Sequence, residues 1–145
     1  MAAKEVINHL NIVLLETYAL YLKTQNYHWN VTGPNFYSLH KMFEEQYKEL
    51  AEAIDDIAER IRALGEKVEA NFLHFDRNKS IKDGDSSNSS EYMLKDLVEG
   101  QKIVIEKLRE LSNVASEYGD KTSEDMAIQR LHVHEKQKWM LSSSL

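Results

Sequence analysis

The fold is decided by residues 40–65, which read HKMFEEQYKELAEAIDDIAERIRALG. One stripe of mostly apolar side chains recurs three and four residues apart along this stretch: His40, Phe43, Tyr47, Leu50, Ile54, Ile57, Ile61 and Leu64. That spacing follows the turn of an α-helix and places the stripe on one face. Asn35 can cap the helix and Gly65 supplies its stop. The stretch predicts a long amphipathic helix.

A second helix is predicted before this one, from about Lys4 to Val31. Its stripe has heptad spacing, and Thr32-Gly33-Pro34 ends it. The stripe consists of Ile7, Leu14, Tyr21 and His28, with Leu10 and Tyr18 between them. The two helices therefore form a hairpin.

Two more helices are predicted in the C-terminal half. One runs from about Glu91 to Tyr118, where Gly119 ends it. Its core side is Leu94, Leu97, Val98, Ile105, Leu108, Leu111 and Ala115. The other begins with Thr122 or Ser123 as cap and runs through Ile128, Leu131, Trp139 and Leu141.

The middle of the chain, residues 66–90, has weak periodicity. Residues 71–75 predict a short helix, and residues 79–90 a polar loop rich in Ser, Asn, Asp and Gly. A segment of this length can run along a bundle and make the second and third long helices parallel. We therefore expect an all-α four-helix bundle with a long crossover, formed as one domain by residues 1–145.

The composition excludes several classes of chemistry. The chain has 145 residues, no Cys, one Pro and five Gly, with 18 Lys+Arg against 24 Asp+Glu and a net charge of −6. Without Cys, any metal site must use His, Asp and Glu. The acidic balance argues against an obligatory nucleic-acid binder, whose affinity comes from clustered basic residues.

The N-terminal residues Met1–Val6 contain no apolar signal segment, and the run Ile12–Leu15 is too short to span a bilayer. We expect a cytoplasmic protein without a membrane partner.

Five residues have the spacing of metal ligands. His28 ends the first helix and His40 begins the second, so a turn links them, and Glu44 lies one turn beyond His40. Asp55 and Glu59 are four residues apart and project the same way. At about 100° per residue, all members on the second helix lie on one broad side of it.

Distance along the helix divides these residues into two groups. At 1.5 Å per residue, His40 lies roughly 22 Å from Asp55 and roughly 28 Å from Glu59. They cannot share an ion within one chain, whereas an antiparallel two-fold mate would bring them together twice. Alternatively, Asp55 and Glu59 have a separate structural role, paired with a neighbour such as Arg62.

The same residues also have a purely structural interpretation. A lone His on an apolar stripe is usually a core residue, and neighbouring acids are usually a solvated face. Buried acids, however, are costly unless they are paired or bind metal. No Glu in the chain is followed three residues later by His, which argues against a di-metal site inside one bundle.

Two motifs give the chain a family resemblance. Residues 28–33, HWNVTG, followed by Leu39-His40 and Glu44, resemble the first signature of the Dps family of ferritin-like mini-ferritins. Residues 54–60, IDDIAER, followed by Leu64-Gly65, resemble its second signature. The helix layout extends the resemblance over nearly the whole chain.

The resemblance implies a ferritin-like bundle that assembles into a hollow homododecamer. It implies ferroxidase sites at the two-fold interfaces, with His28, His40 and Glu44 from one subunit and Asp55 and Glu59 from its mate. Such proteins bind Fe(II), oxidise it preferentially with hydrogen peroxide and store ferric mineral. No organic cofactor is implied. Mixed imidazole and carboxylate ligands suit Fe(II), and also Zn(II) and Mn(II).

The sequence departs from the family pattern at two places. Glu44 stands where Asp is common, and its longer arm affects the second iron position. Glu66-Lys67-Val68 lacks the small residue or proline often found there. Trp29, next to a ligand, either intercepts stray oxidising equivalents or is a packed interface aromatic.

DNA binding is expected to be weak or absent. DNA-binding members of the family usually carry a Lys/Arg-rich tail, whereas Lys4 lies beside Glu5 here and residues 142–145 are SSSL. The competing hypothesis is a protein that compacts DNA and shields it physically.

Acids near the last helix have two interpretations. Asp120 and Asp125 match acids that line three-fold iron pores in this family, or they are a helix cap with dipole-favoured acids. His132 and His134 in the last helix are interpreted as structural.

Overall fold

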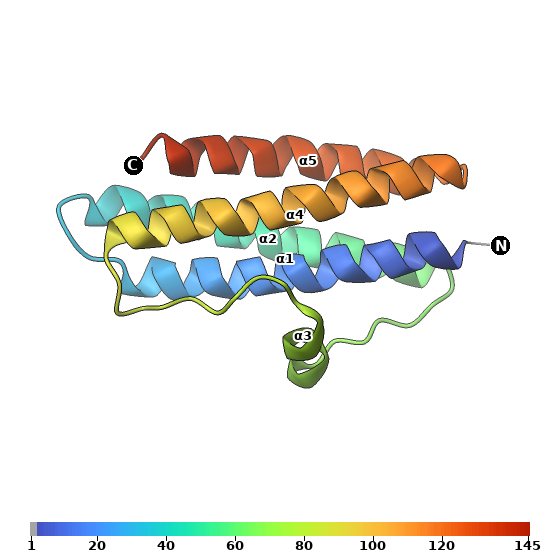
Figure 1. The fold of residues 1–145 in the computed structure, drawn as a ribbon, viewed down its shortest axis with the longest axis horizontal. Helices are drawn as coiled ribbons and strands as arrows, with labels where there is room; N and C mark the ends of the chain where they lie inside the picture. Colours follow the sequence, from blue (N-terminus) through green and yellow to red (C-terminus); the bar gives the residue numbers. More distant parts are fainter. Residues whose placement is uncertain (1–2) are drawn as a thin grey trace.

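The computed structural model describes residues 3–145, which form five helices and no strand. The helices are α1 (Lys4–Asn30), α2 (Phe36–Ala63), α3 (Phe72–Asn78), α4 (Ser90–Glu117) and α5 (Lys121–Ser142). The four long ones make a bundle and α3 lies across its side (Figure 1). The all-α fold with a short helix in the crossover is confirmed.

The long helices pair as two antiparallel hairpins, α1 with α2 and α4 with α5, and α1 also packs on α4. After α2 the chain returns along the bundle before α4 begins, so α2 and α4 run in the same direction (Figure 1). The predicted crossover and the parallel relation of these helices are confirmed.

The crossover is attached to α1 by buried polar contacts. One Glu16 carboxylate oxygen accepts hydrogen bonds from the backbone N–H groups of Ser80 (2.8 Å) and Ile81 (3.4 Å). The Tyr27 hydroxyl accepts one from the Asp85 N–H at 3.0 Å and donates to Asp96 on α4 at 2.6 Å. The bonds from Ser80, Ile81 and Asp85 satisfy main-chain N–H groups of the crossover where it runs over the surface of the bundle.

The stripe of α2 behaves as its spacing predicts. Phe43, Leu50, Ile57 and Ile61 are all buried in the core. Gly65 follows the helix with φ +100°, a conformation that a Cβ disfavours. Asn35 occupies the N-cap position, but its side chain makes no capping hydrogen bond.

Helix α5 differs from its predicted pattern. Leu141 is buried as predicted, but Ile128 and Trp139 are exposed. The buried face also carries the polar residues Arg130, His134 and Gln137. The cap is not Thr122 or Ser123. It is Asp120, as the capping interpretation of this acid predicts, and Asp120 accepts a hydrogen bond from the Ser123 N–H at 3.0 Å. Polar side chains reach the core here because they bond to one another.

That core network links three helices. His134 Nδ1 donates to Gln101 Oε1 at 2.7 Å, and Arg130 donates to His134 Nε2 at 2.9 Å. Gln101 donates to Gln137 at 2.8 Å, and Arg130 pairs with Glu49 of α2. The network replaces apolar contacts between α2, α4 and α5.

None of the helices within residues 3–145 is long and apolar enough to cross a membrane.

Candidate metal centre

The turn between α1 and α2 brings His28 and His40 face to face. Their rings are stacked, with centroids 3.9 Å apart and planes 15° from parallel. Phe36 stacks on the outer face of the His40 ring with centroids 5.0 Å apart. His28 itself is buried. The predicted proximity of the two histidines is therefore present within one chain.

Hydrogen bonds fix which nitrogen of each ring is free. Nδ1 of His28 lies 2.7 Å from the His40 carbonyl oxygen, and Nδ1 of His40 lies 2.7 Å from the His28 carbonyl oxygen. A carbonyl oxygen only accepts, so both Nδ1 atoms carry the proton. An imidazole protonated at Nδ1 has its lone pair on Nε2 in its neutral form, the arrangement found in metal-ligating histidines.

Glu44 completes this group. Its Oε2 lies 3.8 Å from His28 Nε2, and its Oε1 accepts a hydrogen bond from Lys48 Nζ at 3.1 Å. The hydrogen bond from Lys48 lowers the pKa of Glu44, against a smaller opposing effect of desolvation. One ligand atom from each of His28, His40 and Glu44 lies within 4.8 Å of the others. The set offers two imidazole nitrogens and a carboxylate.

The second group lies further along α2 and contains one more acid than the sequence predicts. Asp55, Asp56 and Glu59 are exposed, and each offers an oxygen within 4.8 Å of the others. A hydrogen bond in which the Glu59 carboxyl donates to Asp55, and then the charge of Asp55, raise the pKa of Glu59. Arg62 donates to the Glu66 carbonyl instead of pairing with these acids. Asp56 was missed because it lies outside the i, i+4 pair.

The donor sets of both groups fit a cation with borderline or hard ligand preferences. A divalent ion would occupy the Nε2 lone pairs in the first group and relieve the mutual repulsion of the carboxylates in the second. Among residues 3–145, no group of three potential ligands combines members of both sets. Within one chain, the two groups are therefore separate.

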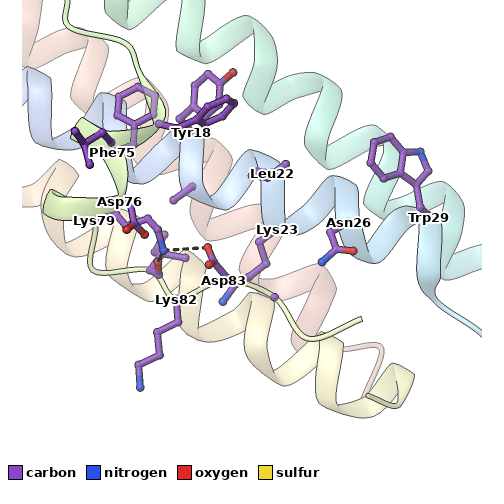
Figure 2. A pocket seen from close by; sticks show the side chains of 15 residues that line it. Tyr18, Leu22, Lys23, Asn26, Trp29, Phe75, Asp76, Lys79, Lys82 and Asp83 are labelled. Atoms are coloured by element: carbon purple, nitrogen blue, oxygen red, sulfur yellow. Dashed lines mark hydrogen bonds and ion pairs between the residues drawn. The ribbon is translucent and has the colours of Figure 1, made fainter. Parts of the chain in front are cut away.

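Trp29 follows His28 in the sequence but faces solvent. Its side chain is 62% exposed and lines a groove of about 730 Å³ between α1 and the crossover. Figure 2 shows Trp29 at one end of this groove and Tyr18 and Phe75 toward the other. Within a single chain, Trp29 is therefore a surface aromatic.

The two acids near α5 have different surroundings. Asp120 accepts hydrogen bonds from Arg60 at 2.9 Å and from the Ser123 hydroxyl at 2.7 Å. Burial opposes ionisation, but the bonds from Ser123 and Arg60 outweigh it and lower the pKa of Asp120. Asp125 is exposed and lines a groove with Asp56 and Glu59. Capping thus accounts for Asp120 and not for Asp125.

Known proteins resemble this chain along its whole length. The ferritin-like domain family matches residues 7–145. General stress protein 20U of Bacillus subtilis is 34% identical over 143 residues, which cover 99% of each chain. Dps from Staphylococcus aureus is 32% identical, with a TM-score of 0.94 over 100% of this chain and 98% of that one.

A third relative belongs to a group of proteins defined by its metal chemistry. The Dps protein from Vibrio cholerae O1, a member of a broad superfamily of ferritin-like diiron-carboxylate proteins, is 31% identical. Its TM-score is 0.92, covering 97% of this chain and 88% of that one. Together with the five-helix fold and the ligand motifs, these similarities show that the chain belongs to the ferritin-like Dps family.

Proposed function

We propose that this protein is a ferroxidase and iron-storage mini-ferritin that protects the cell from oxidative damage. It oxidises Fe(II) at sites between subunits and stores the ferric product inside a hollow homododecamer in the cytoplasm. The observation that carries the proposal is the pair of Nε2 lone pairs of His28 and His40, set beside the Glu44 carboxylate. Iron is here the substrate and the stored product.

The separation of the two ligand groups supports a shared site. His28, His40 and Glu44 supply half of the donors, and Asp55 and Glu59 of a two-fold mate supply the others. An isologous contact pairs each group with the opposite one twice, giving two sites per dimer. Asp56 adds a third carboxylate to the second group.

Hydrogen peroxide is the proposed preferred oxidant. Two Fe(II) ions supply the two electrons that peroxide needs to become water, so no hydroxyl radical is released. Carboxylates from both groups stabilise the harder ferric product. Asp125 and Asp120 are proposed as acids of an iron entry pore. The exposure of Asp125 supports this role for Asp125 more than for Asp120, which caps α5.

Direct DNA binding is proposed to be weak or absent. A net charge of −6 per chain repels phosphate, and a shell of such chains multiplies the effect. A gel-shift titration at low salt checks this: free DNA should persist, and a tight complex at neutral pH without divalent cations would favour the shielding hypothesis.

The proposed activity is tested by mixing Fe(II) with hydrogen peroxide and following the fast optical change of ferric product. The variant His28→Ala/His40→Ala should lose the change, while His132→Ala, an exposed histidine on α5, should keep it. Normal oxidation by the assembled double variant would contradict the site.

Shared sites are tested by complementation between two inactive variants, His28→Ala/His40→Ala and Asp55→Asn/Glu59→Gln. When the two are dissociated, mixed and reassembled, about a quarter of the wild-type activity should return, because half of random dimers are mixed and one of their two sites is intact. Each variant reassembled alone is the control. Assembly without recovery would place the whole site in one chain.

A further inference from the structure

Aromatic rings form a continuous row that starts at a metal ligand. The His28 ring lies 5.2 Å from the Tyr47 ring, Tyr47 lies 6.0 Å from Tyr21, and Tyr21 lies 5.6 Å from Tyr18, all between centroids. Each separation falls within the range of about 4.5–7 Å in which aromatic pairs interact. The three tyrosines thus join the candidate metal centre to a distant part of α1.

The row crosses between two helices. Tyr47 is on α2, two turns after His40, and Tyr21 is on α1, two turns before His28. The three tyrosines are partly buried. Tyr18 packs on Phe75 of α3, with centroids 5.0 Å apart, and lines the groove beside the crossover (Figure 2).

Packing alone would not require tyrosine at these positions. Phenylalanine has the same ring, buries the same apolar area and leaves no hydroxyl to satisfy. The hydroxyl gives tyrosine a further property: a phenol loses a hydrogen atom far more readily than a benzene ring does. Three consecutive phenols beside the proposed iron-oxidising centre can therefore act as donors of hydrogen atoms.

We propose that Tyr47, Tyr21 and Tyr18 form a relay that supplies the second electron when peroxide meets a single Fe(II) at the His28–His40–Glu44 group. The proposal rests on the proposed ferroxidase function. Fe(II) gives one electron and the Tyr47 hydroxyl gives a hydrogen atom, while the O–O bond of hydrogen peroxide breaks. The products are Fe(III), one hydroxide ion, one water molecule and a tyrosyl radical.

The radical then moves along the row. Tyr21 returns one electron and one proton to Tyr47 and becomes the radical, and Tyr18 does the same for Tyr21. Each step exchanges a hydrogen equivalent between identical groups. The oxidising equivalent leaves the neighbourhood of His28 and His40, whose rings would otherwise be exposed to it. Half-loaded sites are thereby protected from damage.

The experiment uses the assembled protein loaded anaerobically with substoichiometric Fe(II) and then mixed with hydrogen peroxide. Samples are frozen during the reaction, and electron paramagnetic resonance records the tyrosyl radical. Wild-type protein should give the signal and Tyr47→Phe should lose it. Tyr92→Phe is the matched control, because Tyr92 lies on α4 outside the row. Persistence of the signal in Tyr47→Phe would overturn the relay.

The direction of transfer is tested with a nitroso spin trap and peptide mapping. Adducts should form on Tyr21 and Tyr18 in wild-type protein and only on Tyr47 in Tyr21→Phe. Adducts confined to Trp29 would contradict the relay.

The same samples distinguish the two proposals. Ferric product without any tyrosyl radical overturns the relay and leaves the ferroxidase standing. Absence of ferric product in wild-type protein overturns the ferroxidase and the relay together.

Discussion

Histidine has opposite environments in two regions of this bundle. At the α1–α2 turn, His28 and His40 each give the Nδ1 proton to a carbonyl and keep Nε2 free. In the core beside α5, His134 uses both nitrogens: Nδ1 donates to Gln101, and Nε2 accepts from Arg130. His28 and His40 each keep Nε2 for a ligand, whereas both nitrogens of His134 are already hydrogen-bonded.

The difference shows that burial does not identify a ligand. His28 and His134 are both buried, yet only His28 combines a backbone partner with an unoccupied second nitrogen. His134 stabilises contacts between helices, as the sequence interpretation of this residue expects. A free nitrogen beside a carboxylate is the feature by which we propose His28 as a ligand and interpret His134 as structural.

The largest expected effect is on metal affinity. His28→Leu should weaken Co(II) or Zn(II) binding more than about 100-fold, because losing even an outer partner of a ligating histidine costs about 10- to 100-fold. Isothermal titration of the assembled protein measures it. His134→Leu should bind with wild-type affinity, and equal losses in the two variants would erase the distinction.

The next effect is on stability, and here the large change is expected in the His134 variant. His134→Leu should lower the free energy of unfolding by about 3 kcal/mol, since each buried group left without its partner costs roughly 1–3 kcal/mol. The stranded groups are the Gln101 oxygen and an Arg130 N–H. Urea denaturation measures the change, with His132→Leu on the exposed side of α5 as control. A change as small as that of the control would mean that the network contributes little.

The smallest effect is a difference in pH dependence. Burial, and then the charge of Arg130, hold the pKa of His134 well below its usual value of 6.5. Below that pH the unfolded chain binds a proton that the native protein does not, so stability falls as the pH falls. The slope is at most about 1.4 kcal/mol per pH unit.

Urea midpoints between pH 7 and pH 5 check this slope. Wild-type protein should lose stability more steeply than His134→Gln, which has no group to protonate at this position. Parallel curves for the two proteins would show that His134 does not cause the acid sensitivity.

Most of the fold follows from local patterns. The α2 stripe, the stop at Gly65 and the polar loop before α4 are periodicity and turn signals, so they are visible without any tertiary contact. The face of α5 is not, because its apolar residues Ile128 and Trp139 point outward. Arg130, His134 and Gln137 are buried instead, and hydrogen-bond partners from α2 and α4 offset the cost of burying these polar groups.

The candidate site divides in the same way. The spacing of His28, His40 and Glu44 across one turn is enough to predict that they lie close together. The rise per residue along α2 is enough to predict that Asp55 and Glu59 lie too far away to join them. Asp56 lies in the IDDIAER motif but was not predicted as a site residue, because only the i, i+4 pair of Asp55 and Glu59 was assigned there, and Tyr47 lies in neither motif. Tyr47 lies seven residues after His40 on the same stripe, a signal that equally indicates core packing.

The sequence by itself determined the four long helices, the crossover, the two ligand groups and the absence of sulfur chemistry, because these depend on residue type and on spacing along one helix. Only the tertiary structure decided which nitrogens of the histidines are free, which face of α5 is buried, and that Asp120 rather than Thr122 or Ser123 caps it. Those properties depend on hydrogen-bond partners from other helices or across the turn, and sequence spacing does not encode them.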